Sequence, residues 1–256
     1  MIIKTIMAAL VAGLIAGVFT TVAQSARVVP IILHAEEYEG KEPSAEQPAG
    51  IDGHHQQSSL GTASGFHGLM AALSPVTPAF AHEGEHDEGS GIMFGMSRFT
   101  GTLFANLVAG AGFSLLLTAA SLLSGYPVTV RNGVLWGACG WLAVHLLPAV
   151  GLPPELPGFP AADLQQRQIW WVAAVVLSVA GLHLLVLRTE IASKIGGLVF
   201  IAMPHVYGAP QPVDMSSTVP ALLGAEFAVA ALATALASWL FLGFVTGLIN
   251  DRFLKA

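Results

Sequence analysis

Charged side chains are scarce in this sequence. Asp, Glu, Lys and Arg make up 10% of the 256 residues, whereas 54% are hydrophobic. Soluble domains usually carry about 25% charged residues. The mean hydropathy of +0.68, with most charges outside long apolar runs, indicates a polytopic membrane protein. The net charge of −6 leaves no basic patch of the kind that nucleic-acid binding requires.

Cysteine is nearly absent as well. The single cysteine, Cys139, lies in an apolar run, so the chain can form neither an internal disulfide nor a cluster of thiolate ligands. The sequence lacks the Gly-x-x-x-x-Gly-Lys-Ser/Thr loop, which excludes ATP binding by that route. No nucleophile stands in an evident arrangement with a base, so we do not expect an enzyme.

Long apolar runs are what the sequence has in abundance. A membrane-spanning helix needs about 20 residues. We expect full spans at residues 2–23, 98–123, 132–150, 168–187 and 220–248. A shorter apolar stretch, 190–204, is either a half helix or a tilted sixth crossing. The sequence therefore predicts an all-α polytopic membrane helix bundle, with residues 1–256 forming a single membrane domain.

Residues 40–92 differ from the rest in being rich in Pro, Gly, Ser, Gln and acidic residues. This composition predicts a flexible loop outside the bilayer. Its histidines are candidates for loose capture of a divalent cation, and the alternative is a solvated linker. The capture residues are His54, His55, His82 and His86. The stretch from His82 to His86 also matches the H-E-x-x-H pattern of zinc peptidases, but Gly84 interrupts the regular helix that this pattern requires.

Residues 141–171 join two apolar runs through a proline-rich elbow. His145 lies near the end of the first run, and Pro148, which has no N–H to donate, is expected to end or kink that helix. Glu155 and Arg167 follow, so these polar groups are expected near one mouth. The pattern fits either a helix corner with a satisfied histidine beneath it or a cation-handling mouth.

Ionisable groups in a bilayer interior cost about 2.5–3.5 kcal/mol on insertion scales, so they are usually paired or functional. Imidazole with carboxylate suits Co2+, Ni2+ or Zn2+, whereas Ca2+ and Mg2+ prefer oxygen ligands alone. The candidate metal ligands are His145, His205, Glu36, Glu226, Glu155 and His34. Gln24 and Arg167 are candidates for holding these ligands in place. We expect no permanently bound cofactor, with Co2+ or Ni2+ as the transported ion.

The distribution of Lys and Arg predicts an orientation. If Lys4 is cytoplasmic and residues 190–204 cross the membrane, the other basic loops and the basic C-terminal residues also fall in the cytoplasm. The loop 40–92 and the elbow then lie outside. Several candidate ligands approach that external face, which predicts a shared, externally accessible site. They are His34, His145, His205 and Glu226.

Several segments resemble a known family. They are Gln24 with Val29-Pro30-Ile31-Ile32-Leu33, Ala35-Glu36 and Tyr38-Glu39; His145-Leu-Leu-Pro148-Ala-Val-Gly151-Leu-Pro153-Pro154-Glu155-Leu-Pro157-Gly158; Arg167-Gln168-Ile169-Trp170-Trp171; and Pro204-His205-Val206-Tyr207-Gly208-Ala209-Pro210-Gln211-Pro212. On these motifs the chain resembles the CbtA family of predicted cobalt transporter subunits. The loop 40–92 is a departure from the family pattern.

The resemblance implies an integral protein of the bacterial inner (cytoplasmic) membrane, embedded in the lipid bilayer. It implies uptake of Co2+ for cobalamin synthesis together with CbtB, a small single-span partner subunit with a His-rich tail. No ligand assignment is transferred with the motifs. Two alternatives stay open, namely a permease for nickel or another divalent metal and a non-transporting membrane scaffold for a small partner.

Deletion of residues 80–90 tests the peptidase alternative. The deletion removes His82, Glu83 and His86, which are the side chains that a zinc peptidase of this pattern needs. We expect no loss of function, measured as metal uptake by cells. A proteolytic activity that disappears with the deletion would contradict the transport interpretation.

Overall fold

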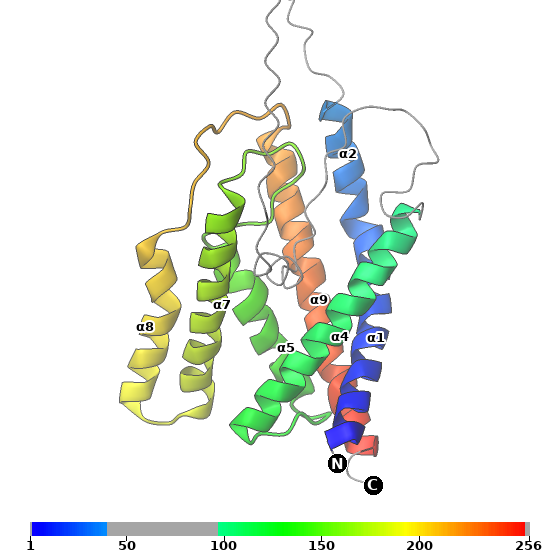
Figure 1. Cartoon of the computed structure of the whole chain (residues 1–256), viewed down its shortest axis with the longest axis vertical. Coiled ribbons are helices and arrows are strands. Elements are labelled where there is room, and N and C mark those ends of the chain that lie inside the picture. The colour runs from blue at the N-terminus through cyan, green and yellow to red at the C-terminus, as the bar shows by residue number, and fades with distance from the viewer. Residues whose placement is uncertain (1, 40–96, 254–256) are drawn as a thin grey trace, which may run out of the picture.

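The computed structural model describes residues 2–39 and 97–253, and the regular elements in these parts of the chain are helical. In chain order they are α1 (Ile2–Arg27), α2 (Val29–Glu39), α4 (Arg98–Ser124), α5 (Gly133–Trp141), the π-helical segment η1 (Leu142–Leu146), α6 (Leu147–Ala149), α7 (Leu164–Leu187), α8 (Ile191–Tyr207) and α9 (Ala221–Phe253). Figure 1 shows them as an elongated helix bundle.

Four of these helices, α1, α4, α7 and α9, are long and apolar enough to cross a membrane. Two shorter apolar helices, Gly133–Ala149 and Ile191–Tyr207, accompany them. The prediction of an all-α polytopic membrane bundle is therefore confirmed. The span expected at 132–150 belongs to the shorter class and is a composite of α5, η1 and α6.

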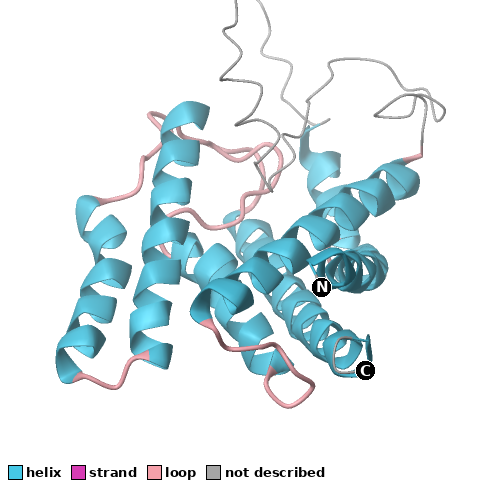
Figure 2. Cartoon of the chain, turned by 60° about the horizontal axis from the view of Figure 1, so that its bottom comes forward, coloured by secondary structure: helices cyan, strands magenta, loops and turns pink. Residues whose placement is uncertain are grey.

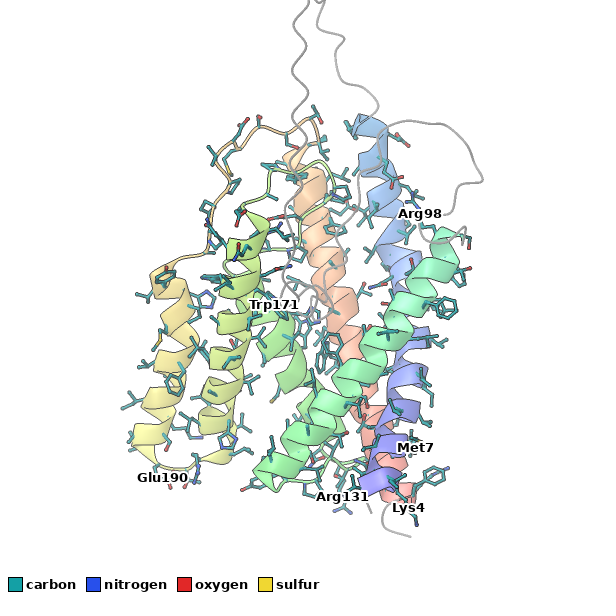
Figure 3. The ribbon with its side chains drawn as sticks, in the orientation of Figure 1. Lys4, Met7, Arg98, Arg131, Trp171 and Glu190 are labelled. Carbon is teal, nitrogen blue, oxygen red and sulfur yellow. The ribbon has the colours of Figure 1, made fainter. Side chains whose placement is uncertain are left out.

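The bundle has two distinct ends. The lower end in Figure 1 holds the start of α1, the end of α9, and the turns from α4 to α5 and from α7 to α8. The upper end holds α2, the elbow at 150–163 and the segment 208–220. Lys4, Arg131 and Glu190 lie at the lower end, whereas Arg98 lies towards the upper end (Figure 3). The elbow and the lower-end turns are therefore at opposite ends of the bundle.

Pro30 and Pro204 both lie within helices, and a turn at Val28 separates α1 from α2. Pro30 lies in the first turn of α2, where a missing N–H is tolerated. Pro204 lies inside α8, which was expected to stop there but continues to Tyr207. Gly208 ends α8 with a left-handed φ of 94°, a conformation that glycine adopts without steric penalty.

Glycines bring the helix backbones into direct contact. A Cβ atom on Gly110 of α4 would lie 2.3 Å from the carbonyl oxygen of Gly13 in α1, and one on Gly243 of α9 would lie 2.0 Å from that of Gly133 in α5. Small residues drive helix association in lipid because apolar surface is already solvated there. The glycine-bearing faces of α1, α4, α5 and α9 are thus contact faces of the bundle.

α7 and α8 form a hairpin at one edge of the bundle, as Figure 2 shows. Gly181 and Gly197 meet across it, since a Cβ on either would lie 2.7 Å from the other's carbonyl oxygen. α7 also packs against η1 and α6, whereas α8 packs mainly against α7. The hairpin is thus attached to the remaining helices chiefly through α7.

Apolar contacts close the upper end. Ala35 of α2, Leu156 of the elbow, and Val219 and Leu223 at the start of α9 form one buried cluster. Each of the four is at most 6% exposed. The elbow is therefore fixed against α2 and α9.

Replacement of Gly110 by alanine should loosen the contact between α1 and α4. The new methyl group would overlap Gly13, and such overpacking costs about 1–3 kcal/mol. We expect a lower thermal unfolding temperature of the detergent-purified protein. The matched control is Gly112→Ala on the same helix, where a Cβ would meet nothing within 4 Å, and its unfolding temperature should stay equal or rise. Equal losses in both variants would contradict a specific contact.

Candidate functional site

His145 lies in a widened turn of a membrane helix. Residues Leu142–Leu146 form a π-helical turn, in which the N–H of Leu147 donates to the carbonyl of Leu142, five residues back. Pro148 has no N–H for the ordinary bond to the residue four positions earlier. The sequence predicted that the helix would end or kink at Pro148. The helix does not end there but runs on to Ala149. π-turns occur frequently at functional sites.

Aromatic rings surround the His145 side chain inside the bundle. Its ring centroid lies 6.1 Å from that of Phe113 in α4 and 6.1 Å from that of Trp239 in α9, both edge-on. Trp239 itself is only 4% exposed. It fits beside α5 because Gly140 has no side chain, as a Cβ there would lie 2.2 Å from the indole ring. His145 thus sits half-buried where α4, α9 and η1 meet.

His205 has a separate environment on α8. Its ring lies 5.8 Å from that of Trp170 in α7, and the indole N–H of Trp170 donates to the carbonyl of Pro204 at 3.2 Å. Both ring nitrogens of His205 are buried without a hydrogen-bond partner. The contacts of His205 and His145 are therefore with different tryptophans on different helices.

Glu155 and Arg167 form an ion pair at the elbow. The guanidinium Nη2 lies 2.8 Å from Oε2 of Glu155, and both side chains are about three-quarters buried. Burial raises the pKa of the Glu155 carboxyl above its ordinary value, and the positive charge of Arg167 opposes that rise. Arg167 lies in the first turn of α7, three residues before Trp170.

A second ion pair joins α2 to α4. Arg98 donates to both carboxylate oxygens of Glu36, at 2.8 Å and 3.3 Å. His34, two residues earlier on α2, is exposed, and its ring lies 5.7 Å from that of Tyr38. Glu36 thus has a guanidinium partner that the sequence analysis did not assign to it.

Gln24 takes part in a polar contact between α1 and α4. The amide nitrogen of Asn106 donates to Oε1 of Gln24 at 2.7 Å and to the hydroxyl of Thr21 at 3.1 Å. Buried polar groups in lipid need such partners. Gln24 therefore links two helices, a role that does not depend on a metal.

The segment 208–220 and the start of α7 enclose an open pocket of about 480 Å³ at the upper end. Two carboxylates line it, and both have local partners. Asp163 caps α7 by accepting from the N–H of Gln166. Asp214 accepts from the N–H and the hydroxyl of Ser216, and these hydrogen bonds hold its pKa below the usual range.

The remaining candidates are scattered or lie outside the described residues. Glu226 is exposed in the second turn of α9. The predicted loop and its four capture histidines fall in the part of the chain that the structure does not describe. In residues 2–39 and 97–253, no group of three or more His, Cys, Asp or Glu side chains is placed to hold a metal ion.

The sequence analysis missed three features of this site. The π-turn had a partial signal in Pro148, three residues after His145. The aromatic partners Trp239 and Phe113 had none, because nothing in the sequence specifies which helices meet. Arg98 lies 62 residues from its partner Glu36, and no pattern in the sequence links the two.

A family model described as "Probable cobalt transporter subunit (CbtA)" matches residues 2–251, nearly the full chain. The chain belongs to the CbtA family. This is a transporter family and not an enzyme family, and cobalt is its probable transported substrate. A subunit implies partner chains. No curated protein and no solved structure matches the chain.

Replacement of Arg167 by glutamine should raise the pKa of Glu155 further. The guanidinium opposes the rise that burial causes, so its loss leaves burial unopposed. In the window between the ordinary pKa of 4.5 and the raised folded value, the folded state binds more protons than the unfolded state. The free energy of unfolding therefore falls as pH rises through this window, and the window widens in Arg167→Gln.

Infrared titration of the protonated carboxyl band can follow this shift, with Glu155→Gln to assign the band. Arg98→Gln is the matched control, because it removes the other ion pair of the upper end and should leave the Glu155 band unmoved. A Glu155 titration that is the same with and without Arg167 would contradict the proposed coupling.

Proposed function

We propose that this CbtA-family chain is the membrane-embedded subunit of a Co2+ uptake system that serves cobalamin synthesis. The observation that carries the proposal is the placement of His145, a half-buried imidazole at a π-turn in the interior of a bundle from a cobalt transporter family. Neutral imidazole is a suitable ligand for Co2+ and Ni2+. Nickel or another divalent metal is the alternative substrate.

His205 provides a second imidazole for this route. Its two ring nitrogens are buried without partners, a state that is costly unless a ligand or water satisfies them. Glu155 pairs with Arg167, which is three residues before Trp170 on α7. In this proposal Arg167 positions Glu155, which offers a carboxylate to the ion at the mouth. Glu36, His34 and Glu226 are further candidate ligands towards the same end.

The transport path needs more ligands than the described residues supply at either histidine. We assign the missing ones to a small single-span, His-rich partner subunit and to the histidines of the loop at 40–92. The absence of a three-ligand cluster in residues 2–39 and 97–253 agrees with sites that are completed at an interface. The word subunit in the family description agrees with this as well.

The proposed setting is the bacterial inner membrane, with the lower end in the cytoplasm. Lys4 and Arg131 gather at that end (Figure 3), and Arg252 lies in the last turn of α9. A surplus of basic residues is typical of the cytoplasmic side. The elbow, with Glu155 and the mouth of the path, then faces the outside.

Cells that carry His145→Ala or His205→Ala test the proposed ligands. Loss of one metal ligand should lower Co2+ uptake at limiting Co2+ by about tenfold or more, since even outer-shell changes cost 10–100-fold in metal affinity. The matched control is His183→Ala, which changes an exposed histidine of α7 and should leave uptake unchanged. Normal uptake in both single variants and in the double variant would dismiss these ligands.

A non-transporting scaffold is the second candidate function. It is favoured by the glycine contacts between helices and by the absence of a group of three metal-binding side chains in the described residues. Reconstitution in liposomes separates the two functions. The transport proposal expects Co2+ influx from the chain together with its partner subunit. A scaffold shows no Co2+ flux in liposomes, although it still binds and stabilises the partner.

A further inference from the structure

The last turn of α8, residues 204–207, is held less firmly than an ordinary helical turn, and we call it the terminal turn. Pro204 has no N–H, so it cannot donate to the carbonyl of Phe200 as another residue would. Gly208 ends the helix directly after the turn, with a φ of 94°. Prolines within helices and residues at helix ends are common positions for a hinge. Two such positions therefore flank His205.

Trp170 holds the terminal turn from the neighbouring helix α7. Its indole N–H donates to the carbonyl of Pro204 at 3.2 Å, and its ring stands edge-on to that of His205. Trp170 is 5% exposed, whereas Val206 in the terminal turn is 85% exposed. Figure 1 shows α8 at the edge of the bundle with α7 beside it. Among the described residues, the terminal turn is thus covered mainly from the side of α7.

The elbow fixes Trp170 in turn. A Cβ atom on Gly151 would lie 2.5 Å from Cη2 of Trp170 and 3.0 Å from the Cβ of Ala209. The lack of a side chain at Gly151 therefore leaves room for the indole ring beneath the elbow. Closely packed side chains have little freedom to move. Trp170 is thus the fixed half of its contact with α8, and the terminal turn is the half that can move.

His205 is the residue whose polar atoms the closed terminal turn conceals. Both ring nitrogens are buried, and neither has a hydrogen-bond partner among the described residues. Polar atoms that lose water and gain no partner cost free energy. A movement of the terminal turn away from α7 would return water to both nitrogens. The indole hydrogen bond therefore favours the closed arrangement, and the two nitrogens oppose it.

We propose that Trp170 is a positioning residue that holds the terminal turn closed over His205. The turn hinges at Pro204 and Gly208, and the ring nitrogens of His205 become accessible only when it swings away from Trp170. An ion that follows the route of the proposed function reaches His205 in the open arrangement alone. This control of access rests on the proposed function, whereas the hinge itself does not.

Acylation by diethyl pyrocarbonate, followed by mass spectrometry of the histidine-bearing peptides, tests the hinge in the full chain purified in detergent. The reagent acylates a ring nitrogen only where it can reach that atom. In the unaltered chain, His205 should react more slowly than His34, which is exposed on α2. Equal rates at the two histidines would contradict the closed arrangement.

Two variants change the hinge in opposite directions. Trp170→Phe keeps an aromatic ring and removes the N–H that holds Pro204. His205 should then react about fivefold faster, which is the scale of one neutral hydrogen bond. Pro204→Ala supplies the N–H that the carbonyl of Phe200 lacks, and it keeps the carbonyl that accepts from Trp170. The terminal turn gains one bond, so His205 should react about fivefold more slowly.

Two further variants serve as controls. Trp171→Phe removes the neighbouring indole, and Gly110→Ala loosens the distant contact between α1 and α4. Both should leave the rate at His205 unchanged, and a rise in either that equals the rise in Trp170→Phe overturns the proposal. An unchanged rate in folded Trp170→Phe overturns it, as does a rate in Pro204→Ala that is not below that of the unaltered chain. If Trp170→Phe fails to fold, Pro204→Ala decides alone.

Co2+ flux in liposomes distinguishes this proposal from the proposed function. If flux occurs but Trp170→Phe leaves the acylation rate of His205 unchanged, the hinge is overturned and the transport proposal stands. If the two hinge variants shift the rate as expected but the unaltered chain with its partner shows no flux, the hinge stands and transport is overturned.

Discussion

The bundle depends on direct contact between helix backbones at paired glycines. In lipid, burial of apolar side chains gains little, because the surrounding hydrocarbon is equally apolar, and close packing must supply the association energy. Gly13 with Gly110, Gly133 with Gly243, and Gly181 with Gly197 each bring one helix within touching distance of the next. The contact between Gly133 and Gly243 places α9 beside α5, and α9 also packs against α1. The position of Trp239, and with it the environment of His145, follows from that arrangement.

The candidate polar groups lie at positions that the glycine contacts do not occupy. His145 uses a π-turn, His205 uses the side of α8 next to Trp170, and Glu155 uses the elbow above α7. Each group stands against an aromatic ring or an arginine, and the described residues bring no three metal-binding side chains together. On the proposed function, the subunit would supply single ligands at several levels, and water or other chains would complete each coordination sphere. A chain of weak sites suits passage, because an ion that is held by many ligands leaves slowly.

Much of this architecture could be predicted from the sequence, since long apolar runs in lipid allow helices alone. The elbow could also be predicted from its prolines, and the structure places Glu155 against Arg167 there. The rotation of each helix was not predictable. The Gly181–Gly197 contact sets which side of α8 meets α7, and thereby turns His205 towards Trp170. The π-turn at Leu142–Leu146 could not be predicted. A proline in a membrane helix permits a kink, a helix end or a π-turn, and the packing around it selects one. Glu36 and Arg98 meet only because α2 stands beside the start of α4.

The length of α9 has a consequence for the membrane itself. Its 33 residues span about 50 Å at a rise of about 1.5 Å per residue, whereas the hydrocarbon core of a bilayer is about 30 Å thick. Roughly 20 Å of this helix must therefore tilt or emerge among the headgroups. Leu223 in its first turn packs against Ala35 of α2 and Leu156 of the elbow, which holds this end of α9 to the upper end of the bundle. Bilayer thickness thus sets how far the upper face stands out of the membrane, and a thinner bilayer exposes more of it to water.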